Sequence, residues 1–139
     1  MKVLFLCVAN SARSQMAEGL ARAILPPSVE VASAGSYRSR VHPYAVQALA
    51  EIGIDIRHHQ SKNVDELPPS FHETVDYVIT LCAEEVCPAY LYKATHLHWP
   101  LPDPSSLGVT ADSQLEGFRR VRDAITAKLR EFASSVQQS

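Results

Sequence analysis

Residues 3–18 read VLFLCVANSARSQMAE, and the fold can be argued outward from this stretch. An uninterrupted apolar run over residues 3–6 leads into Cys7, a short polar segment follows, and a helical pattern of apolar residues then begins. A continuous apolar run of this kind is typical of a buried strand in a parallel sheet. The stretch therefore predicts a strand, a tight loop and a helix, with Cys7 at the base of the loop.

The loop is predicted to bind a tetrahedral oxyanion. A helix amino terminus presents unpaired N–H groups and the positive end of the helix dipole, and both favour an anion. Arg13 can hold two anion oxygens in a fork that lysine cannot reproduce, and with the dipole it favours the thiolate form of Cys7. Ser14 can donate its hydroxyl proton to that thiolate, and Asn10 tolerates the positive φ of a tight loop. The residues expected to surround the anion are Val8, Ala9, Asn10, Ser11, Ala12, Arg13 and Ser14.

The same residues have a simpler interpretation, which is a buried structural cysteine beside a surface arginine. The pair Cys7 and Arg13, taken alone, would occur by chance in many proteins. Here the pair falls between a strand pattern and a helix pattern. We therefore interpret Cys7 as a nucleophile at an anion site.

Length and composition indicate one ordinary globular domain. The chain has 139 residues, of which 46% are hydrophobic and 20% are charged. We expect a single domain over residues 1–133 and a frayed carboxyl-terminal tail over residues 134–139. The formal net charge of −2 and the scattered basic residues give no footprint for nucleic acid or for an anionic membrane.

The three cysteines are too few for a disulfide scaffold, and their odd number fits reactive thiols in a reducing compartment. The apolar amino terminus faintly imitates a signal peptide. Its apolar run is short, however, it lacks a preceding charged segment of normal length, and Leu6 is not the small residue that cleavage needs. No run approaches the length of a transmembrane helix. We expect a cytoplasmic protein.

The rest of the chain alternates helix-like and strand-like patterns. Helices are predicted over residues 15–25, 43–52, 64–67 and 113–132, and strands over residues 29–32, 77–81 and 95–98. Repeated strand–helix units with a closing helix predict an α/β fold, a doubly wound, four-stranded parallel sheet in the order 2-1-3-4 flanked by helices. Arg119, Arg120 and Arg122 are interpreted as a solvated face of the final helix.

Cys82 follows the strand predicted over residues 77–81, just as Cys7 follows the first strand. In an open parallel sheet, ligands bind outside the carboxyl ends of the strands, so the two thiols could meet across the site. Cys87 comes five residues later. Both later cysteines could instead be small buried hydrophobes. We favour a redox role, because all three cysteines fall at strand ends or in adjoining loops.

Two histidine pairs suggest metal ligands, but neither predicts a metal site. His58 and His59 are neighbours in an extended segment, where side chains face opposite ways, so a polar surface loop is the preferred interpretation. His96 and His98 share a face of the last strand and could join the two later cysteines around zinc. The spacing His-x-His is, however, tighter than that of structural zinc sites.

The opening loop is similar to that of a known family. Residues 6–19, written LCxxNSxRSQMAEG, look like the opening loop of low-molecular-weight tyrosine phosphatases and are closer still to their relatives, the thiol-dependent arsenate reductases. The likeness continues at SAG (33–35), TLC (80–82), CP (87–88), HWxLxDP (98–104) and FRRVRD (118–123). The resemblance therefore spans nearly the whole chain, and it implies the fold of that family and a tetrahedral-anion substrate.

The resemblance further implies reduction of arsenate to arsenite by three thiols in sequence. The Cys7 thiolate attacks arsenic, and Asp103 protonates the departing oxygen. Cys82 then attacks Cys7, which releases arsenite, and Cys87 attacks Cys82 to leave a disulfide that a thioredoxin-like partner reduces. Glutathione with glutaredoxin, or mycothiol, serves other relatives, and no bound cofactor is expected. Phosphate and sulfate are expected as substrate analogues, and the chain as a monomer.

Lys62 departs from one feature of the family. In some arsenate reductases the equivalent loop supplies a carboxylate to a monovalent cation near the opening loop. Lys62 occupies that place here. We therefore expect its ammonium group to replace the cation, and we expect no potassium requirement.

Two other functions remain as alternatives. A low-molecular-weight tyrosine phosphatase would use the same opening loop and a Cys7 phosphoenzyme, but Cys82 and Cys87 would then have no task. Residues 105 and 106 are serines where those phosphatases usually carry aromatic residues, and Gln15 replaces a proline that is common in them. A non-catalytic redox sensor or metal-binding module is the alternative of another class.

Overall fold

Four strands form one parallel sheet in the order β2-β1-β3-β4, which confirms the predicted topology. This computed structural model describes residues 1–83 and 90–137. The strands are β1 (Lys2–Cys7), β2 (Glu30–Gly35), β3 (Tyr77–Cys82) and β4 (Thr95–Leu101). The helices are α1 (Arg13–Ile24), α2 (Pro43–Ala50), α3 (Pro69–Thr74) and α4 (Ala111–Gln137), with short 3₁₀ turns η1 (Val64–Glu66) and η2 (Pro104–Ser106). In this part of the chain, no helix combines the length and the apolar character that a membrane span needs.

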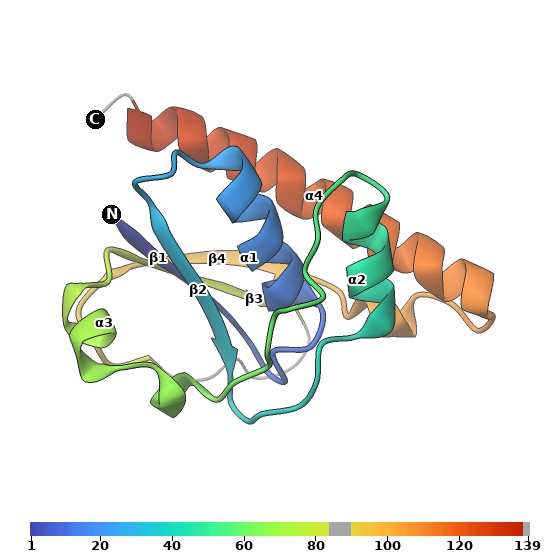
Figure 1. The fold of residues 1–139 in the computed structure, drawn as a ribbon, viewed down its shortest axis with the longest axis horizontal. Helices are drawn as coiled ribbons and strands as arrows, with labels where there is room; N and C mark the ends of the chain where they lie inside the picture. Colours follow the sequence, from blue (N-terminus) through green and yellow to red (C-terminus); the bar gives the residue numbers. More distant parts are fainter. Residues whose placement is uncertain (84–89, 138–139) are drawn as a thin grey trace.

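Helices α1, α2 and α4 cover one face of the sheet, and α3 lies against the other (Figure 1). Side-chain alternation along β1 supplies both layers, since Val3 and Phe5 join the core on the α1 side and Leu4 and Leu6 join the smaller core on the α3 side. All four side chains are fully buried. A strand that is covered on both faces needs an unbroken apolar run, which is the pattern of residues 3–6.

Several elements extend beyond their predicted bounds, two of them at the carboxyl edge of the sheet. Helix α1 begins at residue 13 rather than 15, so Arg13 and Ser14 lie in its first turn. Strand β2 continues to Gly35, where it pairs with Cys7 at the end of β1. Helix α4 continues to Gln137, five residues beyond its predicted end, so residues 134–137 are helical where a frayed tail was predicted. The longer β2 and earlier α1 bring more residues to the predicted site.

Helix α3 is an element that the sequence pattern did not predict. Pro69 stands at its first position, where the missing N–H of proline removes no helical hydrogen bond and its φ is already suitable. Phe71 anchors the helix in the α3-side core beside Val78. The proline pair that follows the predicted helix at residues 64–67 therefore begins a further helix.

Arg122 corrects the prediction that the arginines of α4 form only a solvated face. Its side chain is 11% exposed, donates to the carbonyl oxygen of Ala48 at 2.8 Å, and pairs with Glu51 at 3.1 Å. Arg119 also binds Glu51, with its Nη2 2.7 Å from the carboxylate. Only Arg120 behaves as predicted, with three quarters of its side chain exposed. The prediction failed because the end of α2 packs against this side of α4.

Candidate active site

The loop between β1 and α1 turns a series of peptide N–H groups toward one centre. The carbonyl oxygens of residues 8, 9, 10 and 11 accept hydrogen bonds from groups outside the loop, which are Ser36 N, Ser61 Oγ, Gln15 Nε2 and His42 N. In a planar trans peptide the carbonyl and the next N–H point in opposite directions. The N–H groups of residues 9–12 therefore face inward, and this geometry suits a bound oxyanion.

Asn10 and Gly35 make the tight loop possible. Asn10 has a φ of +50°, and it is the one non-glycine residue with positive φ in the described part of the chain. Gly35, at the end of β2, lies directly against the loop backbone. A Cβ at that position would lie 2.5 Å from the carbonyl oxygen of Val8 and 2.8 Å from the amide nitrogen of Asn10. The positive φ predicted for Asn10 is confirmed, and the glycine permits the close approach.

A cavity of about 190 Å³ opens over the loop, and it brings together residues from distant parts of the chain. Its lining comprises Cys7, Ala9, Ser11, Ala12, Arg13, Ser39, His42, Asp103 and Ser105. Cys7 is a free thiol with 3% exposure. Arg13 is 6% exposed, and its Nη1 donates to the carbonyl oxygen of Leu101 at 3.0 Å, which fixes the guanidinium at the cavity wall.

The directions of the hydrogen bonds near Cys7 follow from a backbone group. The N–H of Lys62 donates to Asn10 Oδ1 at 2.9 Å, so the amide nitrogen of Asn10 must be the donor on the other side. That nitrogen donates to Ser14 Oγ at 2.7 Å. The hydroxyl proton of Ser14 is then available to Cys7, whose sulfur lies 2.8 Å away. Ser14 is thus arranged as a donor to a thiolate.

Asp103 reaches the cavity from the segment that follows β4. Its Oδ1 accepts hydrogen bonds from the N–H and the hydroxyl of Ser105, at 3.0 and 2.7 Å, and thereby caps η2. Within the described residues, its Oδ2 has no protein donor. One oxygen therefore holds the turn, and the other is available as a candidate proton donor at the cavity.

His42 is a cavity residue that the sequence pattern did not single out. Its N–H donates to the carbonyl oxygen of Ser11, and its Nδ1 accepts the N–H of Tyr44 at 3.1 Å and so caps α2. Burial lowers the pKa of His42, and the charge of Asp103 opposes that shift. The neutral ring carries its proton on Nε2, because Nδ1 is an acceptor. Its position immediately before a proline-initiated helix is the signal that could have identified the cap.

Cys82 ends β3 next to β1, but strand alternation assigns Cys7 and Cys82 to opposite faces of the sheet. Cys7 follows Phe5 on the α1 side, whereas Cys82 follows Val78 on the α3 side. Cys82 is 2% exposed. The two strand ends are adjacent as predicted, and the side chains leave the sheet in different directions. Cys87 lies outside the described residues.

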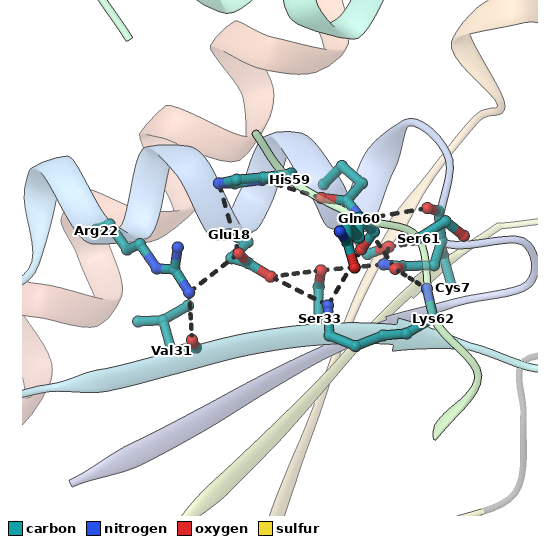
Figure 2. A network of polar contacts seen from close by, with 12 residues as sticks. Cys7, Glu18, Arg22, Val31, Ser33, His59, Gln60, Ser61 and Lys62 are labelled. Carbon is teal, nitrogen blue, oxygen red and sulfur yellow. Dashed lines mark hydrogen bonds and ion pairs between the residues drawn. The ribbon is translucent and has the colours of Figure 1, made fainter. Parts of the chain in front are cut away.

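Glu18 of α1 is a buried carboxylate beside the loop, and Figure 2 shows the polar groups that surround it. The hydroxyl of Ser33 donates to its Oε1 at 2.7 Å, and Nη2 of Arg22 lies 3.1 Å from its Oε2. Nζ of Lys62 lies 3.9 Å from Oε1. Glu18 and Ser33 both lie in motifs that carry the family resemblance, but no role was predicted for either residue. The ammonium of Lys62 lies next to this carboxylate.

His59 corrects the prediction of a polar surface loop at the first histidine pair. His58 is exposed, but the side chain of His59 is only 4% exposed and lies between Glu18 and Gln15. Adjacent side chains do face opposite ways, and one of those directions is the protein interior. Among the described residues, no three His, Cys, Asp or Glu side chains are grouped as a metal site.

The chain matches, over residues 2–139, the family described as low molecular weight phosphotyrosine protein phosphatase. It belongs to that family. An arsenate reductase of Halalkalibacterium halodurans is 40% identical over 135 residues, which are 96% of this chain and 95% of that protein. A solved arsenate reductase in the phosphate binding state is 33% identical, with a TM-score of 0.78 and coverage of 96% and 97% of the two chains. A thioredoxin-dependent arsenate reductase of Corynebacterium glutamicum is 33% identical, with a TM-score of 0.73, and covers 99% of this chain and 62% of its own.

Two residues of this chain, Gln15 and Ser105, differ from those usual in the tyrosine phosphatases of the family and make polar contacts at the site. Gln15, where a proline is common in the tyrosine phosphatases, bonds through its amide to Asn10 and to His59. Ser105 holds the Asp103 carboxylate where those phosphatases usually place an aromatic residue. Among the described residues, the cavity lining includes no Phe, Tyr or Trp side chain that could hold a phosphotyrosyl ring.

Proposed function

We propose that this protein reduces arsenate to arsenite, with Cys7 as the nucleophile. The observation that carries the proposal is the position of a free thiol at the base of a ring of inward N–H groups, with the buried Arg13 beside it. Arsenate is a tetrahedral oxyanion, which such N–H groups and a guanidinium stabilise. The names of the similar proteins support arsenate as the substrate, and the phosphate-binding relative supports the anion geometry.

In the first step, the Cys7 thiolate attacks arsenic and an S–As bond forms. One As–O bond breaks, and its oxygen leaves as water after it receives protons. Asp103 is the proposed acid, because it lines the same cavity and one carboxylate oxygen remains available there. Arg13 and the loop N–H groups stabilise the charge on the remaining oxygens.

The reduction itself requires a second thiol, for which we assign Cys82. Its thiolate attacks the sulfur of Cys7, so that an S–S bond forms and the S–As bond breaks. The electron pair of that bond stays on arsenic, which passes from As(V) to As(III) and leaves as arsenite. Cys82 is disulfide-bonded in this structure, and strand alternation places it on the opposite face of the sheet from Cys7. That disulfide must therefore be reduced, and the end of β3 must rearrange, for this step.

Regeneration completes the proposed cycle. Cys87 attacks Cys82, the Cys7 thiolate is freed, and a thioredoxin-like dithiol supplies two electrons to the resulting disulfide. The thioredoxin-dependent relative from Corynebacterium glutamicum supports that donor, and glutathione with glutaredoxin is the other candidate. Cys87→Ser should therefore abolish repeated turnover with thioredoxin alone.

The experiment that tests the function is arsenite production from arsenate with thioredoxin, thioredoxin reductase and NADPH, for wild type and Cys82→Ser. We expect steady turnover by the wild type and none by the mutant, which lacks the thiol that releases arsenite. A wild type without turnover, even with glutathione and glutaredoxin added, would refute reduction. Brisk hydrolysis of p-nitrophenyl phosphate by both proteins would instead favour the family's phosphatase activity.

We also propose that Lys62 replaces a monovalent cation beside the loop. Its N–H and its ammonium both act there, on Asn10 and near Glu18. Arsenate turnover at matched ionic strength should be equal in sodium and potassium salts, and Lys62→Met should slow it. A wild-type rate that rises with potassium would contradict the replacement.

A further inference from the structure

Both ring nitrogens of His59 face hydrogen-bond acceptors. Nδ1 lies 3.0 Å from Oε1 of Gln15, and Nε2 lies 3.5 Å from Oε2 of Glu18, as Figure 2 shows for the ring and the carboxylate. The orientation of Gln15 is settled by its other contacts. Its amide nitrogen is close to three carbonyl oxygens, the backbone oxygens of Asn10 and Gln60 and the side-chain Oδ1 of Asn10. The atom that faces His59 is therefore an oxygen, and His59 must donate.

From Gln15 the hydrogen bonds continue without a break to the nucleophile. Nε2 of Gln15 donates to Oδ1 of Asn10 at 2.8 Å, and the amide nitrogen of Asn10 donates to Ser14 at 2.7 Å. Ser14 donates to the sulfur of Cys7 at 2.8 Å. The directions of the amide links are fixed, because each carbonyl oxygen can only accept. The last link runs from Ser14 to Cys7 when the sulfur is a thiolate, which can only accept. A chain of aligned donors thus runs from His59 to Cys7.

We propose that His59 is a positioning residue for Cys7, because its Nδ1–H fixes Gln15 at the start of this chain. The proposal rests on the proposed role of Cys7 as the nucleophile. A neutral imidazole has a single N–H, for which Gln15 and Glu18 compete. The imidazolium has two N–H groups and can donate to Gln15 and to Glu18 at the same time. Protonation of His59 therefore tightens the chain, and the tautomer with its proton on Nε2 releases Gln15.

The charges that face His59 come from α1 and from its own loop. Burial is the largest influence and lowers the pKa of His59, while Glu18 raises it. Arg22 on α1 and His58 and Lys62 on the loop lower the pKa further. The change of charge therefore falls on the acid side of the usual range for histidine.

Three substitutions of His59 distinguish the roles of its two ring nitrogens. The amide nitrogen of asparagine can take the place of Nδ1, whereas that of glutamine reaches the place of Nε2. His59→Asn therefore keeps a donor for Gln15, His59→Gln keeps one only for Glu18, and His59→Phe removes both. His58→Asn is the matched control, since His58 is the exposed neighbour.

The measurement is the alkylation rate of Cys7 by iodoacetamide as a function of pH, in the whole reduced protein, with the Cys7 peptide quantified by mass spectrometry. His59→Phe and His59→Gln should slow alkylation near neutral pH by about three- to tenfold, the effect of weakening one hydrogen bond to a thiolate. They should also move its pH profile toward alkaline values. His59→Asn and His58→Asn should keep the wild-type rate and profile.

Equal alkylation in all variants would overturn the positioning role, and continued arsenate turnover in those variants would leave the proposed function intact. An equal loss in the Asn and Gln variants would also overturn it, because packing rather than the Nδ1–H donor would then be responsible. If the Phe variant fails to fold, the comparison of Asn with Gln still decides the question. A Cys7 that resists alkylation even in the wild type would instead contradict the proposed function.

Discussion

Ser14 is the residue on which the proposed chemistry of Cys7 most directly depends. It accepts from Asn10 and donates to Cys7, and the thiol it serves is almost completely removed from solvent. A thiolate in such a place has lost most of its water and needs protein donors to replace it. The first turn of α1, where Ser14 stands, supplies the dipole as well as the hydroxyl.

Ser14→Ala should therefore slow arsenate reduction without unfolding the protein. A hydrogen bond to a charged group contributes roughly 1.5–3 kcal/mol, so kcat/KM should fall about ten- to a hundredfold. The measurement is steady-state arsenite production with a thiol donor. Ser134→Ala, on the exposed side of α4, is the control and should behave as wild type. An unchanged kcat/KM in Ser14→Ala would show that the dipole and Arg13 suffice.

His42 makes the stability of the fold depend on pH. Its pKa is lowered from 6.5 in the folded state, so the folded state disfavours the charged ring. Stability is then complete above the unfolded pKa and is lost as the pH falls through that value toward the folded one. Protonation would also remove the acceptor that caps α2.

His42→Asn should remove this pH dependence, because asparagine caps a helix without titrating. We expect the free energy of unfolding, measured by urea denaturation between about pH 8 and pH 5, to fall more steeply for wild type than for the variant. Parallel curves for the two proteins would contradict the assignment to His42.

At the scale of elements, the opening loop is held by three neighbours and not by its own sequence alone. The end of β2 meets it at Gly35, the segment at Ser61 and Lys62 binds its Ala9 and Asn10, and the start of α2 binds Ser11. Each neighbour fixes a different carbonyl or side chain. The inward direction of the N–H groups is consequently a property of the assembled elements.

Gly35→Ala should damage activity more than stability. The new Cβ would press on Val8 and Asn10, whose backbone cannot move without turning N–H groups away from the anion. A misplacement of about 1 Å can cost about a hundredfold in rate, so arsenate turnover should fall on that order. Gly53→Ala provides the opposite case, since its φ of +83° strains the backbone while nothing lies within 4 Å. It should lower the melting temperature and leave turnover unchanged.

The junction between α2 and α4 also makes stability depend on pH, here because a carboxylate is stabilised in its charged form. Hydrogen bonds and charge from Arg119 and Arg122 hold the pKa of Glu51 below its usual value. The stability that this carboxylate contributes is present above its unfolded pKa and is lost as the pH falls through the folded value. Glu51→Gln should thus be less stable than wild type at neutral pH, and the difference should vanish in acid. A constant difference in denaturation midpoint across that range would contradict the ion pair.

At the scale of the whole molecule, the site lies where both cores end. Strand β1 carries side chains into both of them and terminates at the cavity, so an anion bound there contacts the end of the most buried strand. Any ligand that binds only the folded state raises the free energy of unfolding.

Sulfate should therefore stabilise the protein through the cavity. At about a hundred times its Kd the gain is about 2.7 kcal/mol, measured as a rise in melting temperature by calorimetry. Arg13→Lys should lose most of the rise, because lysine cannot hold two oxygens in the same fork. An equal rise in both proteins would indicate a general salt effect.

Sequence patterns predicted the sheet because its evidence is local. The apolar run of residues 3–6 and the strand–helix alternation predict the sheet order once connections are taken as right-handed. The positive φ of Asn10 is indicated by its residue type. The roles of His59 and Arg122 were not predictable in this way. Each depends on which distant element covers it, and neither periodicity nor residue type records that.

The chain of donors that ends at Cys7 passes through two consecutive amides, Gln15 and Asn10. An amide can transmit orientation, but its nitrogen does not take up and release protons near neutral pH. The interior route from the sulfur to Glu18 therefore cannot conduct a proton. The proton released when Cys7 becomes a thiolate must leave through the cavity, toward Asp103 and solvent. The buried carboxylate and imidazole influence the sulfur only through their field and through the geometry that they impose.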